Sequence, residues 1–301
     1  MTLKLQYPYL GYKKDCQQVP IQFPPQHQDA QPGIEKIMDP RPIFDNPEYK
    51  GSGKLKGKKA LITGGDSGIG RATAVAMAKE GADIAIVYYD EHEDARFTKE
   101  CVEKYNRRCI LFSGDISDER FCRDVVKETA KAYGCIDILV NNAGVQFPQN
   151  SIEDISQEQL ELTFHVNLFG MFYMTKAVLK HMKRGSAIVN TTSVTAYVGE
   201  DDLIDYASTK GAIVSFTRAM ANSLMEKGIR VNAVAPGPIW TPLQPASWPP
   251  DYITTFGSDN PMKRAGQPWE LAPTYVYLAS MDSTYVTGQV LHVDGGASMQ
   301  S

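Results

Sequence analysis

Seven short runs of aliphatic and β-branched residues recur along the chain, and longer amphipathic stretches separate most of them. Such runs are typical of strands buried on both faces, and this alternation is typical of a parallel sheet covered by helices. The pattern therefore predicts an α/β fold, a single doubly wound Rossmann-type domain with a seven-stranded parallel sheet. Its strands are expected at residues 59–63, 83–88, 109–113, 136–140, 187–192, 229–235 and 289–293.

Helical spacing of apolar residues, ending near Gly or another turn signal, predicts helices at residues 71–80, 157–182 and 205–227. Residues 235–261 interrupt the alternation with several prolines and two tryptophans. A loop of this length is often functional, so we expect a lid over a substrate, with Trp240 and Trp248 as its apolar walls.

Residues 1–50 are rich in Pro, Gln and Tyr and show neither helical nor strand periodicity. This segment is predicted to be an extended N-terminal arm, followed by one catalytic domain at residues 51–301. Because the arm carries aromatic residues and prolines but no converging titratable groups, we expect it to pack on a neighbouring subunit and not to take part in chemistry.

Composition excludes several classes of function. A net charge of −4 gives no electrostatic reason to bind nucleic acid, and no apolar stretch approaches the length of a membrane span. The N-terminus lacks the features of a secretory signal. The five cysteines form no C-x-x-C pair and the histidines form no H-E-x-x-H motif. The sequence therefore predicts a cytoplasmic protein without a protein-ligated structural metal.

A glycine cluster follows directly after the first predicted strand and opens a helix, with the spacing G-x-x-x-G-x-G from Gly64 to Gly70. Backbone N–H groups in such a turn can approach a pyrophosphate, and the helix dipole adds partial positive charge. A plain tight turn is the alternative. The position after the first strand of a seven-strand pattern favours phosphate binding.

Tyr206 and Lys210 are four residues apart in a predicted helix, which places them on one face. A neighbouring ammonium favours the phenolate, so the pair could serve as an acid–base at neutral pH. Ser193 follows a strand and could donate a hydrogen bond to a substrate oxygen. An ordinary hydroxyl at a strand end is the alternative for Ser193.

Six motifs in order resemble those of the short-chain dehydrogenase/reductase family over roughly residues 54–297. They are T-G-G-D-S-G-I-G at 63–70, N-N-A-G at 141–144, Asn167, Ser193, Y-A-S-T-K at 206–210 and A-P-G-P-I-W-T-P at 235–242. The resemblance implies that Tyr206 is the acid–base, that Lys210 holds the cofactor ribose and that Ser193 polarises the substrate. It also implies that Asn167 locally breaks its helix and supports a water-linked proton relay; a buried polar residue used only in helix packing is the alternative.

The resemblance further implies a set of cofactor contacts. Asn-Asn-Ala-Gly and Pro-Gly-Pro are also ordinary turn sequences, which leaves a purely structural role open for them. The implied contacts are Gly64, Asp66, Ser67, Gly68, Ile69, Gly70, Tyr88, Tyr89, Asp115, Ile116, Asn142, Ala143, Gly144, Tyr206, Lys210, Pro236, Gly237, Ile239 and Thr241.

In this fold, residues at the end of the second strand contact the adenosine ribose. An acid there bonds the 2'-hydroxyl of NAD, whereas an Arg binds the 2'-phosphate of NADP. The sequence there is Val-Tyr-Tyr-Asp at 87–90, which carries neither usual signal. The acids at 90, 91, 93 and 94 would repel a phosphate, so NAD is favoured over NADP. Alternatively, Asp90 and Glu93 form only a helix-capping box.

The arm and glycine motif are similar to those of bacterial family members of the general-stress, aldehyde-reducing and glucose-dehydrogenase-like kinds. The substrate class implied is a small aldehyde, ketone, alcohol or sugar, and family resemblance implies a homotetramer built through the two long helices and the last strand. A 3-oxoacyl-carrier-protein reductase and a non-catalytic dinucleotide sensor are the alternatives.

Overall fold

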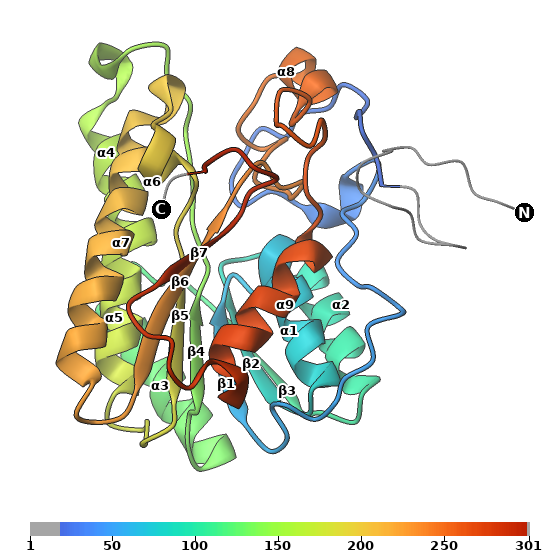
Figure 1. The fold of residues 1–301 in the computed structure, drawn as a ribbon. Helices are drawn as coiled ribbons and strands as arrows, with labels where there is room; N and C mark the ends of the chain where they lie inside the picture. The colour runs from blue at the N-terminus through green and yellow to red at the C-terminus, as the bar shows by residue number, and fades with distance from the viewer. Residues whose placement is uncertain (1–18, 300–301) are drawn as a thin grey trace, which may run out of the picture.

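A computed structural model describes residues 19–299 and contains the predicted seven-stranded parallel sheet (Figure 1). The strand order is β3-β2-β1-β4-β5-β6-β7, and every neighbouring pair is parallel. The fold class predicted from the sequence is confirmed. The strands are β1 (Lys59–Thr63), β2 (Asp83–Tyr88), β3 (Cys109–Ser113), β4 (Ile138–Asn141), β5 (Ala187–Thr191), β6 (Arg230–Pro236) and β7 (Val290–Val293).

Helices cover both faces of the sheet (Figure 1). One layer contains α1 (Gly68–Lys79), α2 (His92–Glu103) and α9 (Pro268–Ala279). The other contains α3 (Glu119–Tyr133), α5 (Gly170–Val178) and α7 (Ile204–Leu224), with α4 (Gln157–Phe164) packed on α7. Shorter elements are α6 (Thr195–Val198), α8 (Pro250–Thr255) and the 3-10 turns η1 (Glu35–Ile37), η2 (Ile152–Asp154), η4 (Asp201–Leu203) and η5 (Met281–Ser283).

The expected helix at 157–182 is divided in the structure. A π-helical turn, η3 (His165–Phe169), separates α4 from α5 and contains Asn167. A π-helical turn inside a helix is often found at a functional site. The interruption agrees with the helix break that the family resemblance implies at this asparagine.

The strands are mainly apolar because both faces of the sheet are covered. In β1, Leu61 packs into the core under α3, α5 and α7, whereas Ile62 packs into the core under α1 and α9. Both side chains are fully buried. Successive side chains of a strand point to opposite faces, so apolar residues are needed on both faces of each central strand.

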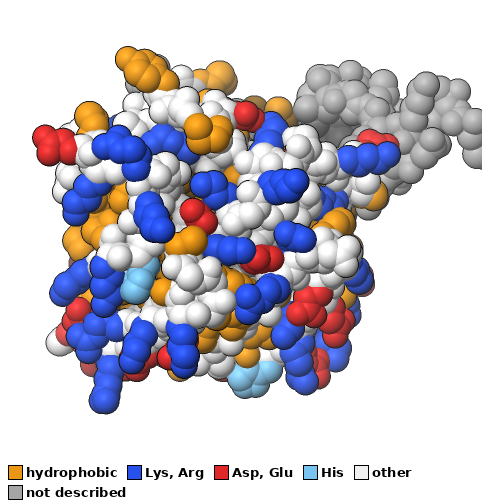
Figure 2. All heavy atoms as spheres, turned by 90° about the horizontal axis from the view of Figure 1, so that it is seen from below, with side chains coloured by type: hydrophobic (Ala, Val, Ile, Leu, Met, Phe, Trp, Pro, Cys, Tyr) orange, Lys and Arg blue, Asp and Glu red, His pale blue; other side chains and the backbone are white. Residues whose placement is uncertain are grey.

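The sheet order reverses between β1 and β4, and the carboxyl ends of the strands leave a crevice at such a point. On the opposite side, the loops that precede β1, β3, β5 and β6 carry the exposed residues Lys56, Lys104, Arg108, Lys183, Arg184 and Lys227. Figure 2 shows this lower face, where Lys and Arg side chains gather. Helices end here, and their dipoles favour cations.

The described part of the arm packs along its own domain, and the expected contact with a neighbouring subunit stays a prediction. The Phe23 ring stacks on Trp240 with 3.8 Å between centroids, and Trp240 Nε1 donates to Pro40 O at 2.8 Å. Asp45 forms an ion pair with Lys79 at the end of α1. Aromatic rings and unpaired backbone groups of residues 19–50 thus find partners within the same chain.

Within residues 19–299, no helix is both long and apolar enough to cross a bilayer. The cysteines of this range, Cys101, Cys109, Cys122 and Cys135, are free thiols, as the sequence predicts. Cys16 lies outside the described residues.

Replacing Leu61 with Ala tests the packing of the central strand. The cavity left between β1 and its helices should lower the free energy of unfolding by about 2–5 kcal/mol, measured by urea denaturation followed by fluorescence. The matched control is Ile152→Ala, because Ile152 is 65% exposed in η2. A Leu61 variant as stable as this control would contradict the assigned core.

Candidate active site

A cleft of about 350 Å³ opens at the carboxyl ends of the strands, beside the turn between β1 and α1. A volume of this size is typical of a small-molecule site. All but two of the predicted site residues line it; the two exceptions are Gly70 and Asn167. The predicted residues in the lining are Gly64, Asp66, Ser67, Gly68, Ile69, Tyr88, Tyr89, Asp115, Ile116, Asn142, Ala143, Gly144, Ser193, Tyr206, Lys210, Pro236, Gly237, Ile239 and Thr241.

The glycine turn fits a dinucleotide because side chains would block it. Gly64 has a φ of +62°, and a Cβ there would lie 2.9 Å from the Cα of Ala143. Gly68, with a φ of +49°, begins α1, whose first N–H groups have no partner within the helix. Gly70 has a packing role instead, since a Cβ at this position would lie 1.8 Å from the carbonyl oxygen of Gly64. The turn therefore offers backbone N–H groups at the wall of the cleft, which is the donor set that phosphates need.

Asn142 holds this turn to the end of β4. Its side-chain amide donates to the carbonyl oxygens of Thr63 at 3.2 Å and Gly64 at 3.1 Å, and its backbone N–H donates to Thr63 Oγ1 at 3.0 Å. The Asn-Asn-Ala-Gly segment thus has a role beyond its own turn, because it fixes the position of the glycine turn.

Ser193 and Tyr206 come together as the sequence predicts. Ser193 follows β5 and Tyr206 lies in the first turn of α7, and both residues line the cleft. Burial raises the pKa of Tyr206 to about 12, and the nearby Ser193 hydroxyl lowers it in part. Both residues line one cleft, and the role of Ser193 stays a prediction, with an ordinary strand-end hydroxyl as the alternative.

Lys210 lies one helical turn after Tyr206, with Nζ 5.3 Å from the centroid of the phenol ring. Nζ donates to the carbonyl oxygen of Thr191 at 3.1 Å. Burial lowers the pKa of Lys210 to about 8. We expected the ammonium to favour the phenolate, but here burial governs both groups, because it disfavours the charged form of each.

Asn167 is buried beside Lys210, behind the wall of the cleft. Its side chain bonds both backbone groups of Val145, at 2.8 and 2.9 Å, and donates to Thr209 Oγ1 at 3.2 Å. A Cβ built on Gly144 would lie 3.2 Å from Asn167 Oδ1 and 3.5 Å from Lys210 Nζ. Asn167 therefore anchors the segment after β4 next to Lys210; its proton relay stays a prediction.

Acidic residues follow the end of β2, next to Asp66 in the lining of the cleft. Burial raises the pKa of Glu91 to about 7, with further increases from Asp90, Asp94 and Asp66. The alternative interpretation as a capping box is wrong, because α2 begins at His92 and has Glu91, without a side-chain hydrogen bond, as its N-cap.

The two tryptophans of the lid do not form the apolar walls that the sequence predicts. Trp240 is fully buried and packs under Phe23, and Trp248 stacks on Tyr252 at 4.2 Å between centroids. Neither tryptophan lines the cleft. They form the small core of the lid, whereas Pro242, Leu243 and Gln244 face the cleft.

The sequence analysis missed two groups of lining residues. Gln31, Pro32 and Gly33 come from the arm, and Val145, Phe147, Leu162 and Val166 come from the loop after β4, α4 and η3. Val145 follows N-N-A-G directly, which could have indicated that residue. Nothing in the Pro- and Gln-rich composition of the arm points to a cleft.

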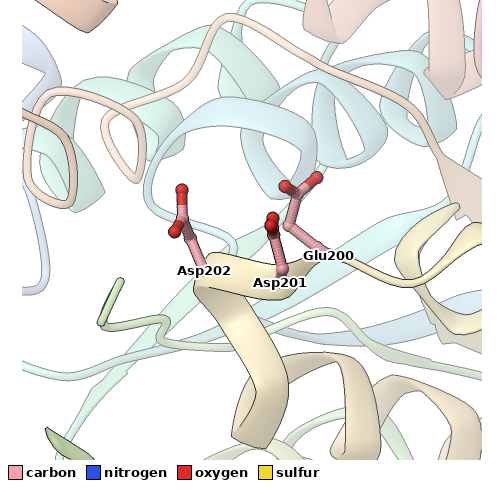
Figure 3. Close-up of side chains that lie close together, drawn as sticks. All are labelled: Glu200, Asp201 and Asp202. Atoms are coloured by element: carbon pink, nitrogen blue, oxygen red, sulfur yellow. The ribbon is translucent and has the colours of Figure 1, made fainter. Parts of the chain in front are cut away.

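Three carboxylates gather where α6 leads into α7, from Glu200, Asp201 and Asp202 (Figure 3). Their oxygens lie within 4.8 Å of one another and point to the same side of the segment. Glu200 and Asp201 are exposed, and exposed acidic groups are common without a bound ion. The expected lack of a structural metal stays a prediction.

Comparison with known proteins agrees with this geometry. The family model described as enoyl-(acyl carrier protein) reductase matches residues 64–298. The chain is 58% identical to general stress protein 39 of Bacillus subtilis, over 92% of this chain and 97% of that protein. It is 52% identical to NADPH-dependent aldehyde reductase 1 of Arabidopsis thaliana, over 90% of this chain and 97% of that protein. It is 51% identical to glucose and ribitol dehydrogenase of Daucus carota, over 92% of this chain and 97% of that protein.

Solved structures show the same architecture. A short-chain dehydrogenase from Burkholderia cenocepacia in complex with NADP superposes with a TM-score of 0.77 at 32% identity, over 81% of this chain and 99% of that chain. A 3-ketoacyl-(acyl-carrier-protein) reductase from Brucella melitensis complexed with NADH gives a TM-score of 0.75 at 34% identity, over 81% and 100%. The chain therefore belongs to the short-chain dehydrogenase/reductase family of oxidoreductases.

Proposed function

We propose that this enzyme transfers a hydride between a nicotinamide dinucleotide and a small alcohol or carbonyl compound. The observation that carries the proposal is that Ser193, Tyr206 and Lys210 line one cleft together with the glycine turn. The turn and the residues after β4 would hold the dinucleotide, whose nicotinamide supplies or accepts the hydride when bound.

Each of the three side chains has a distinct part in the chemistry. In carbonyl reduction, the Tyr206 hydroxyl donates its proton to the substrate oxygen, and Ser193 donates a hydrogen bond to the same oxygen as negative charge develops. The Lys210 ammonium stabilises the phenolate that remains. In alcohol oxidation the phenolate accepts the proton. Burial at the cleft strengthens these interactions, because little water competes for them.

The lining at the substrate end of the cleft is suited to a small, mainly uncharged molecule. Val145, Phe147 and Leu243 give it apolar walls, and the relatives include an aldehyde reductase and a glucose and ribitol dehydrogenase. A small aldehyde, ketone, alcohol or sugar fits this chemistry. An acidic carrier protein fits less well, because Glu200, Asp201 and Asp202 precede α7 whereas cations gather on the opposite face (Figures 2 and 3).

For the cofactor, we propose NAD over NADP. The acids around the end of β2 would repel a 2'-phosphate, and the nearby Arg71 is buried in ion pairs with Glu35 and Asp94. The names of two similar proteins mention NADPH or NADP, and that of a third mentions NADH. The local charges of this chain are therefore the basis of the proposal.

The homotetramer and the cytoplasmic location both stay predictions. The homotetramer is supported by apolar surface on the two long helical segments, where Leu160, Phe169 and Phe172 are 43%, 37% and 48% exposed. An apolar surface of this kind on paired helices is typical of a contact between subunits.

Tyr206→Phe tests the acid–base assignment. Loss of the hydroxyl should lower kcat by about 10²–10⁴-fold while the dissociation constant of the dinucleotide changes little. Absorbance of the reduced nicotinamide, followed with propanal, benzaldehyde, glucose and ribitol, gives the rates. Tyr285→Phe is the matched control because Tyr285 is fully exposed. A Tyr206 variant with the turnover of this control would refute the assignment, and a wild type that binds the dinucleotide without any turnover would favour the sensor.

The rate of carbonyl reduction should depend on the charge of Lys210. Its pKa of about 8 means that Lys210 is protonated below pH 8 and loses its charge above it. We expect kcat/KM for reduction to be constant below this pH and to fall above it, since the phenolate then loses its stabilising cation. Lys210→Arg should move the fall to higher pH. An unchanged wild-type rate from pH 6 to 10 would contradict this role.

Calorimetry with NAD and NADP tests the cofactor preference. We expect the lower dissociation constant for NAD, and we expect Glu91→Gln to strengthen NADP binding by about 2- to 5-fold with a smaller effect on NAD. Glu93→Gln is the control, because Glu93 is exposed and paired with Lys36. Tighter binding of NADP by the wild type would overturn the preference.

A further inference from the structure

The arm carries a buried carboxylate that the chemistry above does not use. Glu35, in η1, is 1% exposed, although it belongs to a Pro- and Gln-rich segment in which no titratable group was expected to converge on anything. Burying a carboxylate is costly unless charges and hydrogen bonds compensate it. Its partners therefore show what holds the arm in place.

Both oxygens of Glu35 bond the glycine turn and the helix that follows it. Oε2 accepts a hydrogen bond from the backbone N–H of Gly68 at 2.6 Å, and Oε1 forms an ion pair with Nη1 of Arg71. Gly68 is the first residue of α1. A residue of the arm thus satisfies an N–H group that the helix itself leaves without a partner.

Arg71 extends the connection to the other end of the turn. Its Nη2 donates to the carbonyl oxygen of Asp66 at 2.7 Å, and the same atom pairs with Asp94 of α2 at 3.2 Å. Its Nε donates to Thr98 Oγ1 at 2.8 Å. Glu35 and Arg71 together therefore hold the backbone at residues 66 and 68, on both sides of Ser67.

Arg71 offsets part of the negative charge of three buried carboxyl groups. Glu35, Asp66 and Asp94 are all buried, and Arg71 is the cation among them. Burial raises the pKa of Glu35 to about 7, and Arg71 and the N–H of Gly68 lower it. The guanidinium also lies over the ring of Phe44 from the arm, at 5.4 Å from its centroid. The arm thus supplies both a carboxylate and an aromatic face to Arg71.

Further contacts keep Glu35 at this place. Its own N–H donates to Asp94 Oδ2 at 2.7 Å. Two residues earlier, Gly33 passes so close to the lid that a Cβ would lie 2.4 Å from the carbonyl oxygen of Pro242. Gln31, Pro32 and Gly33 themselves line the cleft. The arm therefore follows the rim of the cleft from the lid to the glycine turn.

We propose that Glu35 is a positioning residue for the dinucleotide, so that the arm is a part of the cofactor site of its own chain. Glu35 fixes Gly68 and, through Arg71, Asp66, and the turn then has its binding geometry before the cofactor arrives. The inference rests on the proposed function, because it needs a dinucleotide at this turn. Such preorganisation lowers the conformational entropy lost on binding.

If Glu35 positions the glycine turn, its loss weakens cofactor binding; if it only anchors the arm, its loss affects stability alone. Without Glu35, Gly68 loses its partner and Arg71 loses one of two anions, but Arg71 keeps Asp94, Thr98 and the Asp66 carbonyl. The fold should survive, and the dinucleotide should bind more weakly. Tyr206 and Ser193 lie elsewhere in the cleft, so turnover at saturating cofactor should change little.

The test compares Glu35→Ala and Glu35→Gln with Asp45→Ala in the full chain. Asp45 also ties the arm to α1, but through Lys79 at the far end of that helix. Calorimetry gives the dissociation constant of NAD, steady-state assays give kcat, and thermal denaturation gives Tm. We expect Glu35→Ala to weaken NAD binding by about 10-fold and Glu35→Gln, which keeps an acceptor for Gly68, by about 3-fold. Asp45→Ala should stay within about 2-fold of the wild type, with kcat retained in all three.

NAD binding by Glu35→Ala that is as tight as in the wild type, or weakened equally by Asp45→Ala, overturns the inference while leaving the proposed function intact. A wild type that binds neither NAD nor NADP overturns both. Should Glu35→Ala not fold, Glu35→Gln decides by the same comparison with Asp45→Ala. In that case, a dissociation constant for NAD that rises in Glu35→Gln but not in Asp45→Ala supports the positioning role, and an unchanged one overturns it.

Discussion

The backbone after β1 and the backbone after β4 come into contact at the carboxyl edge of the sheet, and the site depends on this close approach. A Cβ at Gly64 would lie 2.9 Å from the Cα of Ala143, and one at Gly70 would lie 1.8 Å from the carbonyl oxygen of Gly64. Only glycine permits such packing. The approach brings N–H groups of the turn, the amide of Asn142 and the residues after β5 to one cleft.

Burial gives the cleft its chemistry. It disfavours the phenolate of Tyr206 and the ammonium of Lys210 alike, so that both pKa values move away from their ordinary values, toward about 12 and about 8. At neutral pH the pair is therefore a neutral phenol and a lysine that is still mainly protonated but loses its proton near pH 8. The Ser193 hydroxyl would donate a hydrogen bond to a substrate oxygen on which negative charge develops. The site is poorly solvated, and a hydrogen bond is stronger there than in water.

The arm adds a constraint that the family motifs do not contain. It packs on the lid through Phe23 and Trp240 and reaches the glycine turn through Glu35. Two parts of the cleft that are far apart in sequence are thus connected by one segment. The lid, whose tryptophans are turned into its own small core, is held on its outer side by the arm.

The sequence by itself determined the sheet, because strands buried on both faces give near-continuous apolar runs, and all seven predicted runs contain strands. It also predicted that Tyr206 and Lys210 lie on one face of a helix, since residues four apart are neighbours there, and the family motifs pointed to Ser193; the structure places all three in the lining of one cleft. Only the tertiary structure decided the role of Glu35, the inward packing of Trp240 and the dominance of burial over the charge of Lys210. Those features arise from contacts between segments remote along the chain, and neither composition nor periodicity encodes which buried group finds which partner.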